Sequence, residues 1–388
     1  MRIVITFPLS LGAPGGGTEG CIQIARHIQL AGAKVLLLPV FTQTHTRRYP
    51  RLQTPETTGC QQEKALKKHG IEIIRVSPHP AHFWLDGLPV KNTLKTILAK
   101  KQIDAVIGWH QEVLFLPKIL RSKKVFFGMI AAGSFKASNP DRRRKILIDY
   151  FVGRSMRKAD VIFAASHYMC DEIRESFNVD TNKFVVAHWG VDPMFVNPNR
   201  SVSEKITRLI FFGWLIPEKG IFETLEALSR VANQGWRDWT LKLAGWGDVE
   251  SVKEVARKKG IPDNIVFLGR LDHPSLAREL AWAQLAILPS HAEAFGLANA
   301  EAQASGMPVI AYDVGAVPEV IKNNVTGWLV PEGNIDLLTD AILEAFRDPE
   351  KTFQMGLAGQ NRITKLFTWG QTANTIINDI ENTKGKTI

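Results

Sequence analysis

The feature that most constrains the fold is a regular alternation of short, continuous apolar runs with amphipathic segments along almost the whole chain. Uninterrupted apolar runs are typical of parallel strands that are buried on both faces, because connecting helices cover both sides of the sheet. The second half of the chain repeats the rhythm of the first. The pattern therefore predicts an α/β protein with two Rossmann-like domains, with strands near residues 2–7, 34–41, 71–76, 104–109, 124–130, 160–166 and 183–189, and then near 208–214, 241–245, 265–269, 285–290, 308–313 and 327–330.

The boundary between the two series falls at residues 191–204, where prolines, asparagines and serines interrupt any regular pattern. A chain of 388 residues is long enough to form two domains with a substantial core each. We expect an N-terminal domain over residues 1–195, a C-terminal domain over residues 205–366 and a last helix over residues 367–388.

Cysteine usage and hydropathy limit where the chain can work. Its three cysteines, Cys21, Cys60 and Cys170, are far apart and form neither a disulfide framework nor a C-x-x-C metal site. The first apolar run ends at Pro8, which is too early for a signal peptide, and no apolar stretch is long enough for a membrane span. We therefore expect a soluble cytoplasmic protein, or one that binds peripherally at the inner face of the membrane.

A glycine-rich loop, "GAPGGGTEG" at residues 12–20, follows the first strand. Gly15, Gly17 and Gly20 fit the dinucleotide pattern G-x-G-x-x-G, but that fold also needs an acid at the end of the second strand. Here the first acid after that strand is Glu56, which disfavours NAD or FAD. A plain glycine turn remains open, as does a phosphate site made by the N–H groups of the helix start at Gly16 and Gly17.

A stronger signal lies in the stretch from Leu285 to Val330, which predicts strand, loop, helix, strand, loop, helix and strand. Glu293 lies in the first loop, Gly296 opens the helix, and Glu301 lies inside it. The N–H groups of a helix start attract anions, and those concerned here belong to Phe295, Gly296 and Leu297. Acids that flank an anion site fit a nucleoside diphosphate sugar, whose hydroxyls lie on both sides of its phosphates.

These residues resemble the retaining glycosyltransferases of the glycosyltransferase-4 family. Glu293 and Glu301 match its E-x7-E motif, inside the frames "PS-x-x-E-x-F-G" and "EA-x-x-x-G-x-P-V-I-A". The segment "FFGWLIPEKG", which ends in Lys219 and Gly220, is similar to the family's G-R-L-x-x-x-K-G segment. A lysine so close to a helix start opposes the helix dipole unless an anion lies near it. An exposed lysine and two ordinary surface acids remain the structural alternative.

The resemblance implies the GT-B fold, with two Rossmann-like domains facing each other across a cleft and a C-terminal helix that crosses back to the N-terminal domain. It implies that a hexose moves from a nucleoside diphosphate sugar, UDP- or GDP-linked, to an acceptor hydroxyl in polysaccharide or glycolipid synthesis, with no cofactor and no metal. The chain has no D-x-D triplet, which agrees. By the resemblance, the donor is bound by Gly16, Gly17, Lys219, Glu293, Phe295, Gly296, Leu297 and Glu301, and catalysis involves Glu293, Lys219 and His110.

The chain departs from the family at two positions. Trp214 stands where the family has a diphosphate-binding arginine, and the histidine that many members carry after the fifth strand is absent near Ile130. His110, after another strand, is the nearest substitute, and a loop histidine with a structural role is an equal alternative. A GT-B epimerase or hydrolase of nucleotide sugars, or a non-catalytic nucleotide-sugar-binding protein, therefore remains open.

Charge points to the acceptor. The net charge is +10, but residues 1–200 carry 29 Lys and Arg against 15 Asp and Glu, whereas residues 201–388 carry 19 against 23. In the family the N-terminal domain binds the acceptor, and here it has basic runs at 46–51, 64–70, 121–124 and 141–145, with Phe83, Trp84 and Phe135 nearby. An anionic or lipid-linked acceptor at a membrane surface fits this charge, although a well-solvated surface explains it equally. No nucleic-acid-binding motif is present.

Overall fold

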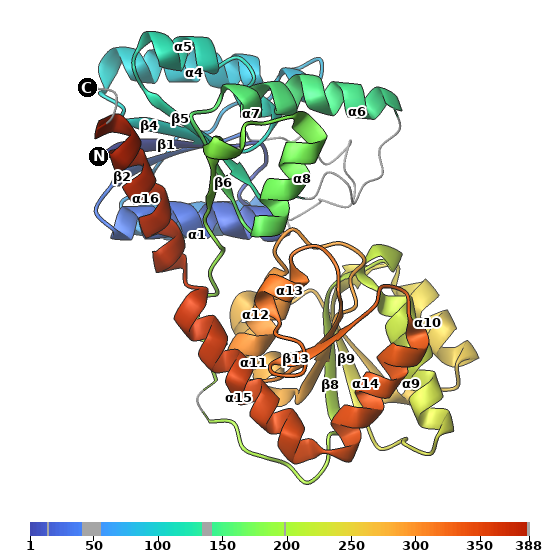
Figure 1. The fold of residues 1–388 in the computed structure, drawn as a ribbon. Helices are drawn as coiled ribbons and strands as arrows, with labels where there is room; N and C mark the ends of the chain where they lie inside the picture. Colours follow the sequence, from blue (N-terminus) through green and yellow to red (C-terminus); the bar gives the residue numbers. More distant parts are fainter. Residues whose placement is uncertain (14, 41–55, 134–141, 198, 386–388) are drawn as a thin grey trace. The chain divides into compact units, whose positions relative to one another are not determined.

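The computed structural model describes residues 1–13, 15–40, 56–133, 142–197 and 199–385 (Figure 1). The chain divides into two compact units. The first unit comprises residues 1–189 and 369–388, and the second comprises residues 190–368. Each unit is an α/β structure built on one parallel sheet, as the alternating pattern predicts.

The first unit has a seven-stranded sheet in the order β3-β2-β1-β4-β5-β6-β7. Its middle strands are buried along their whole length or nearly so, which explains their uninterrupted apolar sequence. The strands are β1 (Arg2–Phe7), β2 (Lys34–Pro39), β3 (Glu72–Ile73), β4 (Ala105–Gly108), β5 (Phe126–Ala131), β6 (Val161–Ala164) and β7 (Phe184–Val186).

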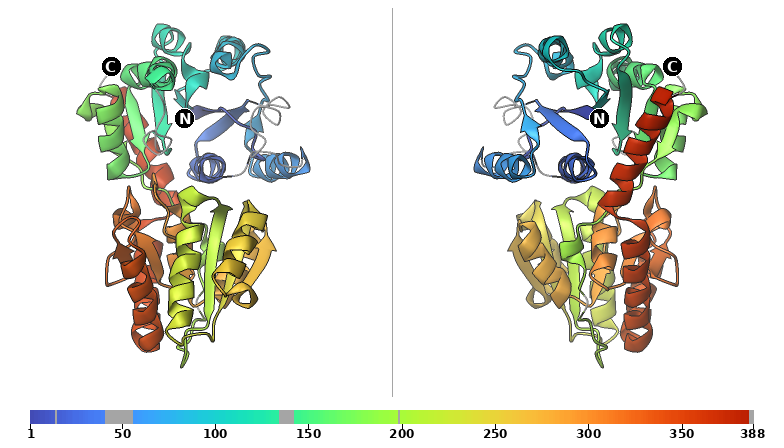
Figure 2. Two further views of the ribbon diagram at one scale, coloured as in Figure 1. Left: turned by 90° about the vertical axis from the view of Figure 1, so that its right-hand side faces the viewer. Right: turned by 90° about the vertical axis from the view of Figure 1, so that its left-hand side faces the viewer.

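Helices cover both faces of this sheet (Figures 1 and 2). Helices α1 and α16 pack against each other on one face, and α4 and α5 lie on the opposite face. The helices are α1 (Gly16–Leu30), α3 (Glu56–Lys68), α4 (Gly87–Lys100), α5 (Pro117–Ser122), α6 (Arg142–Ile148), α7 (Arg154–Lys158), α8 (His167–Phe177) and α16 (Trp369–Gly385), with a π-helix η4 (Asp149–Gly153) and short turns η2 (Phe83–Leu85), η3 (Gln111–Val113) and η5 (Thr181–Lys183).

The second unit has a six-stranded sheet in the order β10-β9-β8-β11-β12-β13. Its strands are β8 (Arg208–Leu215), β9 (Thr240–Gly247), β10 (Ile265–Gly269), β11 (Leu285–Ile287), β12 (Val309–Tyr312) and β13 (Gly327–Val330). Every pairing among them is parallel. Because the first strand of each series lies inside its sheet, each sheet has a point where the strand order reverses, between β1 and β4 and between β8 and β11.

The helices of the second unit form two groups. Helices α9, α10 and α14 pack together, and α12 packs against α15. The helices are α9 (Ile221–Asn233), α10 (Val249–Lys258), α11 (His273–Trp282), α12 (Leu297–Ala304), α13 (Val317–Val320), α14 (Ile335–Arg347) and α15 (Pro349–Leu366), with short turns η6 (Pro193–Phe195), η7 (Pro217–Lys219) and η8 (Pro262–Asn264).

The last helix, α16, belongs to the first unit although it follows the second unit in sequence. Trp369 is buried and its ring lies 5.8 Å from that of Trp189, while the Thr372 hydroxyl donates to the His188 carbonyl. The C-terminal helix therefore returns to the N-terminal domain, which confirms that part of the expected fold. Among the described residues, no helix is both long enough and apolar enough to cross a membrane.

Candidate functional site

The two reversal points of the strand order define where a ligand fits best in each unit. In open parallel sheets, ligands bind beyond the carboxyl ends of the strands at this switch point. In the second unit, the loop after β8 carries Lys219 and the loop after β11 carries Glu293. In the first unit, the loop after β1 is the glycine loop and the loop after β4 carries His110. The sequence-predicted residues thus fall at the switch points.

In the second unit, Lys219 and Glu293 meet directly. Lys219 Nζ donates to Glu293 Oε1 over 2.6 Å, although 74 positions separate the two residues. The lysine side chain is 31% exposed and the glutamate side chain 17%, so both reach solvent at the edge of the sheet. Lys219 lies in the turn η7, just before α9, and not inside the helix. An ammonium has three donors, so Lys219 can hold Glu293 and still donate to a second acceptor.

Two glycines clamp the Glu293 loop between its neighbours. A Cβ on Gly220, in the loop after β8, would lie 2.0 Å from the Pro289 carbonyl oxygen. A Cβ on Gly315, after β12, would lie 2.2 Å from the Glu293 carbonyl oxygen, which also accepts from the Ala316 N–H. Both glycines have positive φ, which other residues rarely adopt. These contacts fix the loop backbone, and with it the root of the Glu293 side chain.

Helix α12 starts directly after this loop. Gly296 is its N-cap at φ 87°, and its carbonyl accepts from the Ala300 N–H, so the first helical residue is Leu297. Phe295 is buried and meets Phe367 edge-on at 5.7 Å between ring centroids. The first N–H groups of a helix have no partner within it, and they carry partial positive charge. Such groups suit an anion.

Glu301 lies in α12 and is only 8% exposed. A glutamate on a solvated helix surface would be far more exposed, so the simple surface-acid alternative does not hold for Glu301. The structure places Glu293 in the loop and Glu301 in the helix, as the sequence predicts. Their roles toward a sugar or a ribose stay predictions.

In the first unit, the glycines of the opening loop have different tasks. Gly15 is the N-cap of α1 at φ 119°, and Gly16 and Gly17 form the first residues of the helix. A Cβ on Gly17 would meet nothing within 4 Å, whereas one on Gly20 would lie 2.6 Å from the Trp189 ring. Gly20 therefore lets α1 approach Trp189, and only the earlier glycines present open backbone N–H groups. A phosphate site at Gly16 and Gly17 stays a prediction.

His110 follows β4 and caps the turn η3. Its backbone N–H donates to Glu112 Oε2 at 2.9 Å, and the Trp109 N–H donates to Glu112 Oε1 at 2.7 Å. The Thr6 hydroxyl, on β1, donates to the same Oε1 at 3.2 Å. Burial lowers the pKa of His110 to about 4, so its imidazole is neutral at physiological pH.

Glu112 is fully buried, and sequence inspection gave no reason to single it out. Burial raises its pKa to about 7, while the N–H and hydroxyl donors oppose that rise. It was hidden because its Thr6 partner lies 106 positions away. A carboxyl group that fastens the His110 backbone at the switch point gives this loop a fixed conformation.

The two departures from the family pattern have different surroundings. Trp214 lies near the end of β8, opposite Trp246 of β9, and the ring centroids are 4.5 Å apart. Both side chains are partly exposed. An aromatic pair thus stands where the resemblance leads us to expect an arginine. Ile130 is buried inside β5 and offers no polar group.

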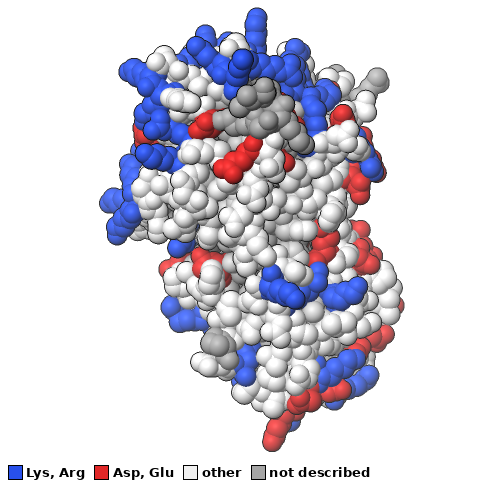
Figure 3. All heavy atoms as spheres, turned by 60° about the vertical axis from the view of Figure 1, so that its left-hand side comes forward, with Lys and Arg blue, Asp and Glu red and all other residues white. Residues whose placement is uncertain are grey.

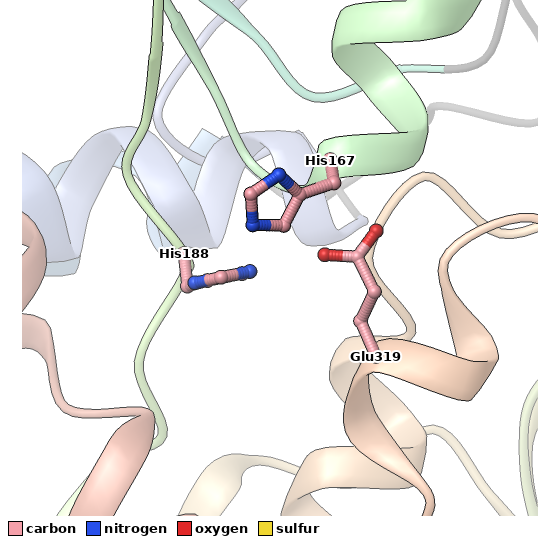
Figure 4. Close-up of side chains that lie close together, drawn as sticks. All are labelled: His167, His188 and Glu319. Atoms are coloured by element: carbon pink, nitrogen blue, oxygen red, sulfur yellow. The ribbon is translucent and has the colours of Figure 1, made fainter.

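Two further histidines come together at the carboxyl edge of the first sheet (Figure 4). His167 begins α8 and His188 follows β7, and their rings meet edge-on with centroids 5.6 Å apart. They lie beyond β6 and β7, away from the switch point between β1 and β4. Glu319, drawn in the same figure, belongs to the second unit.

Comparison with protein families gives two adjoining matches. Residues 14–195 match the model "Glycosyltransferase Family 4", and residues 197–362 match the model "Glycosyl transferases group 1". Glycogen synthase of Mycobacterium tuberculosis is 31% identical over 219 residues, which are 55% of this chain and 52% of that protein. D-inositol 3-phosphate glycosyltransferase of Segniliparus rotundus is 28% identical over 324 residues, 79% of this chain and 66% of that protein. The chain thus spans about half the length of the first curated relative.

Solved structures show the same fold over the full chain. Sucrose-phosphate synthase of Thermosynechococcus elongatus superimposes with a TM-score of 0.79 at 18% identity, covering 100% of both chains. Anabaena HepE in complex with UDP superimposes with a TM-score of 0.78 at 19% identity, covering 98% of this chain and 100% of HepE. At this identity the likeness establishes the two-domain GT-B fold and nothing finer.

Proposed function

Because the chain belongs to glycosyltransferase family 4, we propose that it moves a hexose from a nucleoside diphosphate sugar to an acceptor hydroxyl and retains the anomeric configuration. The observation that carries this proposal is the meeting of Lys219 and Glu293 at the switch point of the second sheet, beside the start of α12. UDP and GDP are the expected nucleotides, and UDP is the nucleotide in the HepE complex.

The positive groups of the second unit suit a departing diphosphate. Lys219 has donors left over from its bond to Glu293, and the N–H groups at the start of α12 add partial positive charge. Donors aimed at developing negative charge stabilise the transition state more than the ground state. In this assignment Glu301 holds the ribose hydroxyls, and Gly16 and Gly17 add backbone donors from the first unit.

Glu293 is assigned to the transferred sugar. Its side chain is partly exposed, and the close approaches of Gly220 and Gly315 fix the backbone of its loop. Such a group can contact the sugar hydroxyls and stabilise an oxocarbenium-like state. A neutral His110 in the first unit serves as a hydrogen-bonding group that orients a hydroxyl, because it carries no charge at neutral pH.

The proposed chemistry takes place on one face of the sugar. The bond between the anomeric carbon and the diphosphate oxygen breaks, the acceptor oxygen bonds to the same face, and its proton passes to the departing phosphate oxygen. A diphosphate is already a good leaving group, so no protonating acid is needed. In this proposal, Lys219 and the N–H groups at the start of α12 stabilise the diphosphate without a metal ion. Full activity in excess EDTA is therefore the expected result.

Product analysis tests the proposed function. The purified chain is incubated with labelled UDP- and GDP-hexoses and a panel of acceptors, and the products are separated and their anomeric configuration read by NMR. Transfer with retention supports the proposal. Free hexose or an epimerised donor favours the hydrolase or epimerase alternative, and binding without turnover favours a sugar-nucleotide-binding protein. An inverted product overturns the mechanism.

For the acceptor, the charge of the first unit supports an anionic partner. Lys and Arg side chains gather over this unit in the face shown in Figure 3. The run at 121–124 is exposed, and so are Lys95, Lys100 and Lys118 on the same side of the sheet. The predicted run at 46–51, Phe135 and residue 141 lie outside the described residues.

One part of the first unit suits a lipid surface in particular. Ile146, Leu147 and Tyr150, on α6 and the following π-helix η4, are 61%, 43% and 50% exposed. Exposed Lys145 and Arg154 lie beside them. Apolar side chains next to basic ones are the combination that binds the interface of an anionic membrane. We therefore propose a lipid-linked acceptor and peripheral membrane docking through this surface.

Vesicle sedimentation tests the docking surface. The chain should sediment with vesicles of phosphatidylcholine and anionic phosphatidylglycerol, and less with phosphatidylcholine alone. Ile146→Glu should reduce sedimentation, since it places a negative charge among the apolar residues. Val325→Glu is the matched control, because Val325 is 50% exposed in the second unit. Equal loss in both variants, or no preference for anionic lipid, would contradict the docking surface.

A further inference from the structure

His291, two residues before Glu293, bonds to three neighbouring segments at the carboxyl edge of the second sheet. Its backbone N–H donates to the Glu218 carbonyl at 3.0 Å. Its ring nitrogens lie 3.0 Å from Glu223 Oε1 and 2.8 Å from Glu332 Oε1. The ring also meets Tyr312 edge-on, with centroids 5.4 Å apart. One side chain thus spans from α9 to the loop after β13.

The partners of His291 surround the Lys219 turn. Glu218 immediately precedes Lys219 in η7, and Glu223 lies in the first turn of α9, directly after it. The backbone bond therefore joins the Lys219 turn to the Glu293 loop, and the bond from the ring to Glu223 joins them a second time. The close approach of Gly220 to the Pro289 carbonyl holds the same two segments together.

The charges around His291 favour its protonated form. Glu223 faces it from α9, Glu332 from the loop after β13, and the phenol of Tyr312 from β12. An imidazole donates from both nitrogens only as an imidazolium. Burial by itself lowers the pKa of His291, but the hydrogen bonds to Glu332 and Glu223 outweigh that effect and raise it above 6.5.

The two acids depend on this charge in different ways. Glu223 Oε2 is buried and has no hydrogen-bond partner among the described residues, so His291 is the main compensation for that carboxylate. Tyr312 supplies no positive charge in place of His291, because burial and the two carboxylates raise its pKa to about 12 and keep it a neutral phenol. Lys219 is engaged with Glu293. Deprotonation of His291 leaves two carboxylates facing a ring with one donor.

We propose that His291 is a positioning residue that ties the Lys219 turn to the Glu293 loop and thereby sets the geometry of the diphosphate site. This inference rests on the proposed function, which assigns Lys219 and Glu293 to the donor. A misplaced Lys219 loses part of its charge-assisted hydrogen bond to a diphosphate, which changes affinity by about tenfold. Affinity for a nucleoside diphosphate should therefore decrease as the pH rises through the pKa of His291.

Nucleotide binding across pH tests this inference. The affinity of the full chain for UDP and for GDP is measured by calorimetry between pH 6 and 9, for the wild type and for His291→Gln. The wild type should lose affinity about tenfold over this range. His291→Gln should bind about tenfold more weakly at pH 6 and show no loss on the alkaline side. His273→Gln, a histidine substitution in the same unit, should behave as the wild type.

A second variant separates positioning from a merely structural effect. Glu332→Gln removes one of the carboxylates that raise the pKa of His291, so the alkaline loss of affinity should begin at lower pH. A structural role would change the stability of the variant without moving this pH dependence. NMR titration of the His291 ring in the full chain gives the pKa directly.

The outcomes distinguish a failure of the proposed function from a failure of the inference about His291. If the wild type binds neither UDP nor GDP, the proposed function is contradicted, and the NMR titration then decides the charge of His291 by itself. If the wild type binds and His291→Gln has the same affinity and pH profile, the inference is overturned while the proposed function stands. A His291 pKa of 6.5 or lower in solution also overturns the inference.

Discussion

The two switch points share one strand order but hold their functional groups in opposite electrostatic states. In the second unit, Lys219 pairs with Glu293 and His291 pairs with two acids, all at least partly exposed. In the first unit, Glu112 is fully buried and accepts three hydrogen bonds, and burial keeps His110 neutral. Exposed ion pairs can exchange partners with a charged ligand, whereas a buried carboxyl group fixes a loop in place.

The largest expected effect concerns the exposed Lys219–Glu293 pair of the second unit. Glu293→Gln keeps the size of the side chain but removes the charge assigned to the sugar, so transfer should fall about 100-fold to 1000-fold. Affinity for UDP or GDP should stay within about threefold, because Lys219 and α12 are unchanged. Steady-state kinetics and calorimetry measure the two quantities.

An ion pair of equal length is the control for that substitution. Lys242 and Glu279 also lie 2.6 Å apart in the second unit, but Lys242 is near the amino end of β9. Glu279→Gln should leave transfer unchanged. Equal losses in the two variants would mean that any broken ion pair in this unit harms activity, and the comparison would lose its meaning.

The next effect concerns the buried Glu112 carboxyl group of the first unit. The pKa of Glu112 is about 7 in the fold against 4.5 for an exposed glutamate, so the folded state retains the proton longer than the unfolded state. Its contribution to stability is therefore fully present below pH 4.5 and is lost as the pH rises to 7. The loss amounts to about 3 kcal/mol.

Glu112→Gln removes this titration. The difference in unfolding free energy between the wild type and the variant should thus change by about 3 kcal/mol between pH 4.5 and 7, as measured by urea unfolding. His110 titrates in both proteins and cancels from the difference. Glu72→Gln, which breaks the exposed pair with Lys101, should show less than about 1 kcal/mol. A pH-independent difference for Glu112→Gln would place its pKa in the ordinary range.

A smaller effect is expected at Glu301. Glu301→Ala should weaken UDP or GDP binding about tenfold, since a charged hydrogen-bond acceptor for the ribose hydroxyls is lost. The corresponding free nucleoside should lose as much affinity as the diphosphate, because the lost contact is to the ribose. Unchanged nucleotide affinity would contradict the role assigned to this residue.

The smallest effect concerns Trp214. Trp214→Arg restores the family's arginine, and a charge-assisted bond to a diphosphate contributes about 2 kcal/mol. Ordering the long arginine side chain on the ligand costs about 1 kcal/mol, so the net gain is about fivefold in UDP or GDP affinity. Loss of the ring contact with Trp246 lowers the folding stability of the variant instead. Weaker binding in this variant would show that the aromatic pair itself takes part in the site.

The sequence predicted the architecture well because its signals are local. Every predicted strand, from 2–7 to 327–330, overlaps a strand of the structure, since an uninterrupted apolar run is what burial on both faces requires. Sequence inspection also singled out Lys219 and Glu293, because they follow strands within recognisable motifs, and their roles stay predictions. Their meeting across 74 positions follows from the strand order, which the motifs imply.

The environments of Glu112, His291 and Gly20 could not be predicted this way, because distant segments make them. Glu112 resembles any loop acid until Thr6 and the turn η3 enclose it. His291 occupies an unspecified position of the frame "PS-x-x-E", and its two acids lie 68 and 41 positions away. Gly20 fits a phosphate-binding pattern, yet Trp189 explains it by packing. Such roles appear only when the fold brings the partners together.

The placement of α16 has a consequence for biosynthesis. Ala373, Ile376 and Ile380 are completely buried, so the helix that completes the N-terminal core is made after the whole second unit. During synthesis, all segments of the second unit are therefore available for folding before the first unit is complete. Until then, the surface of α1 that packs against α16 stays exposed in the first unit. In a chain truncated after residue 368, this surface would remain exposed.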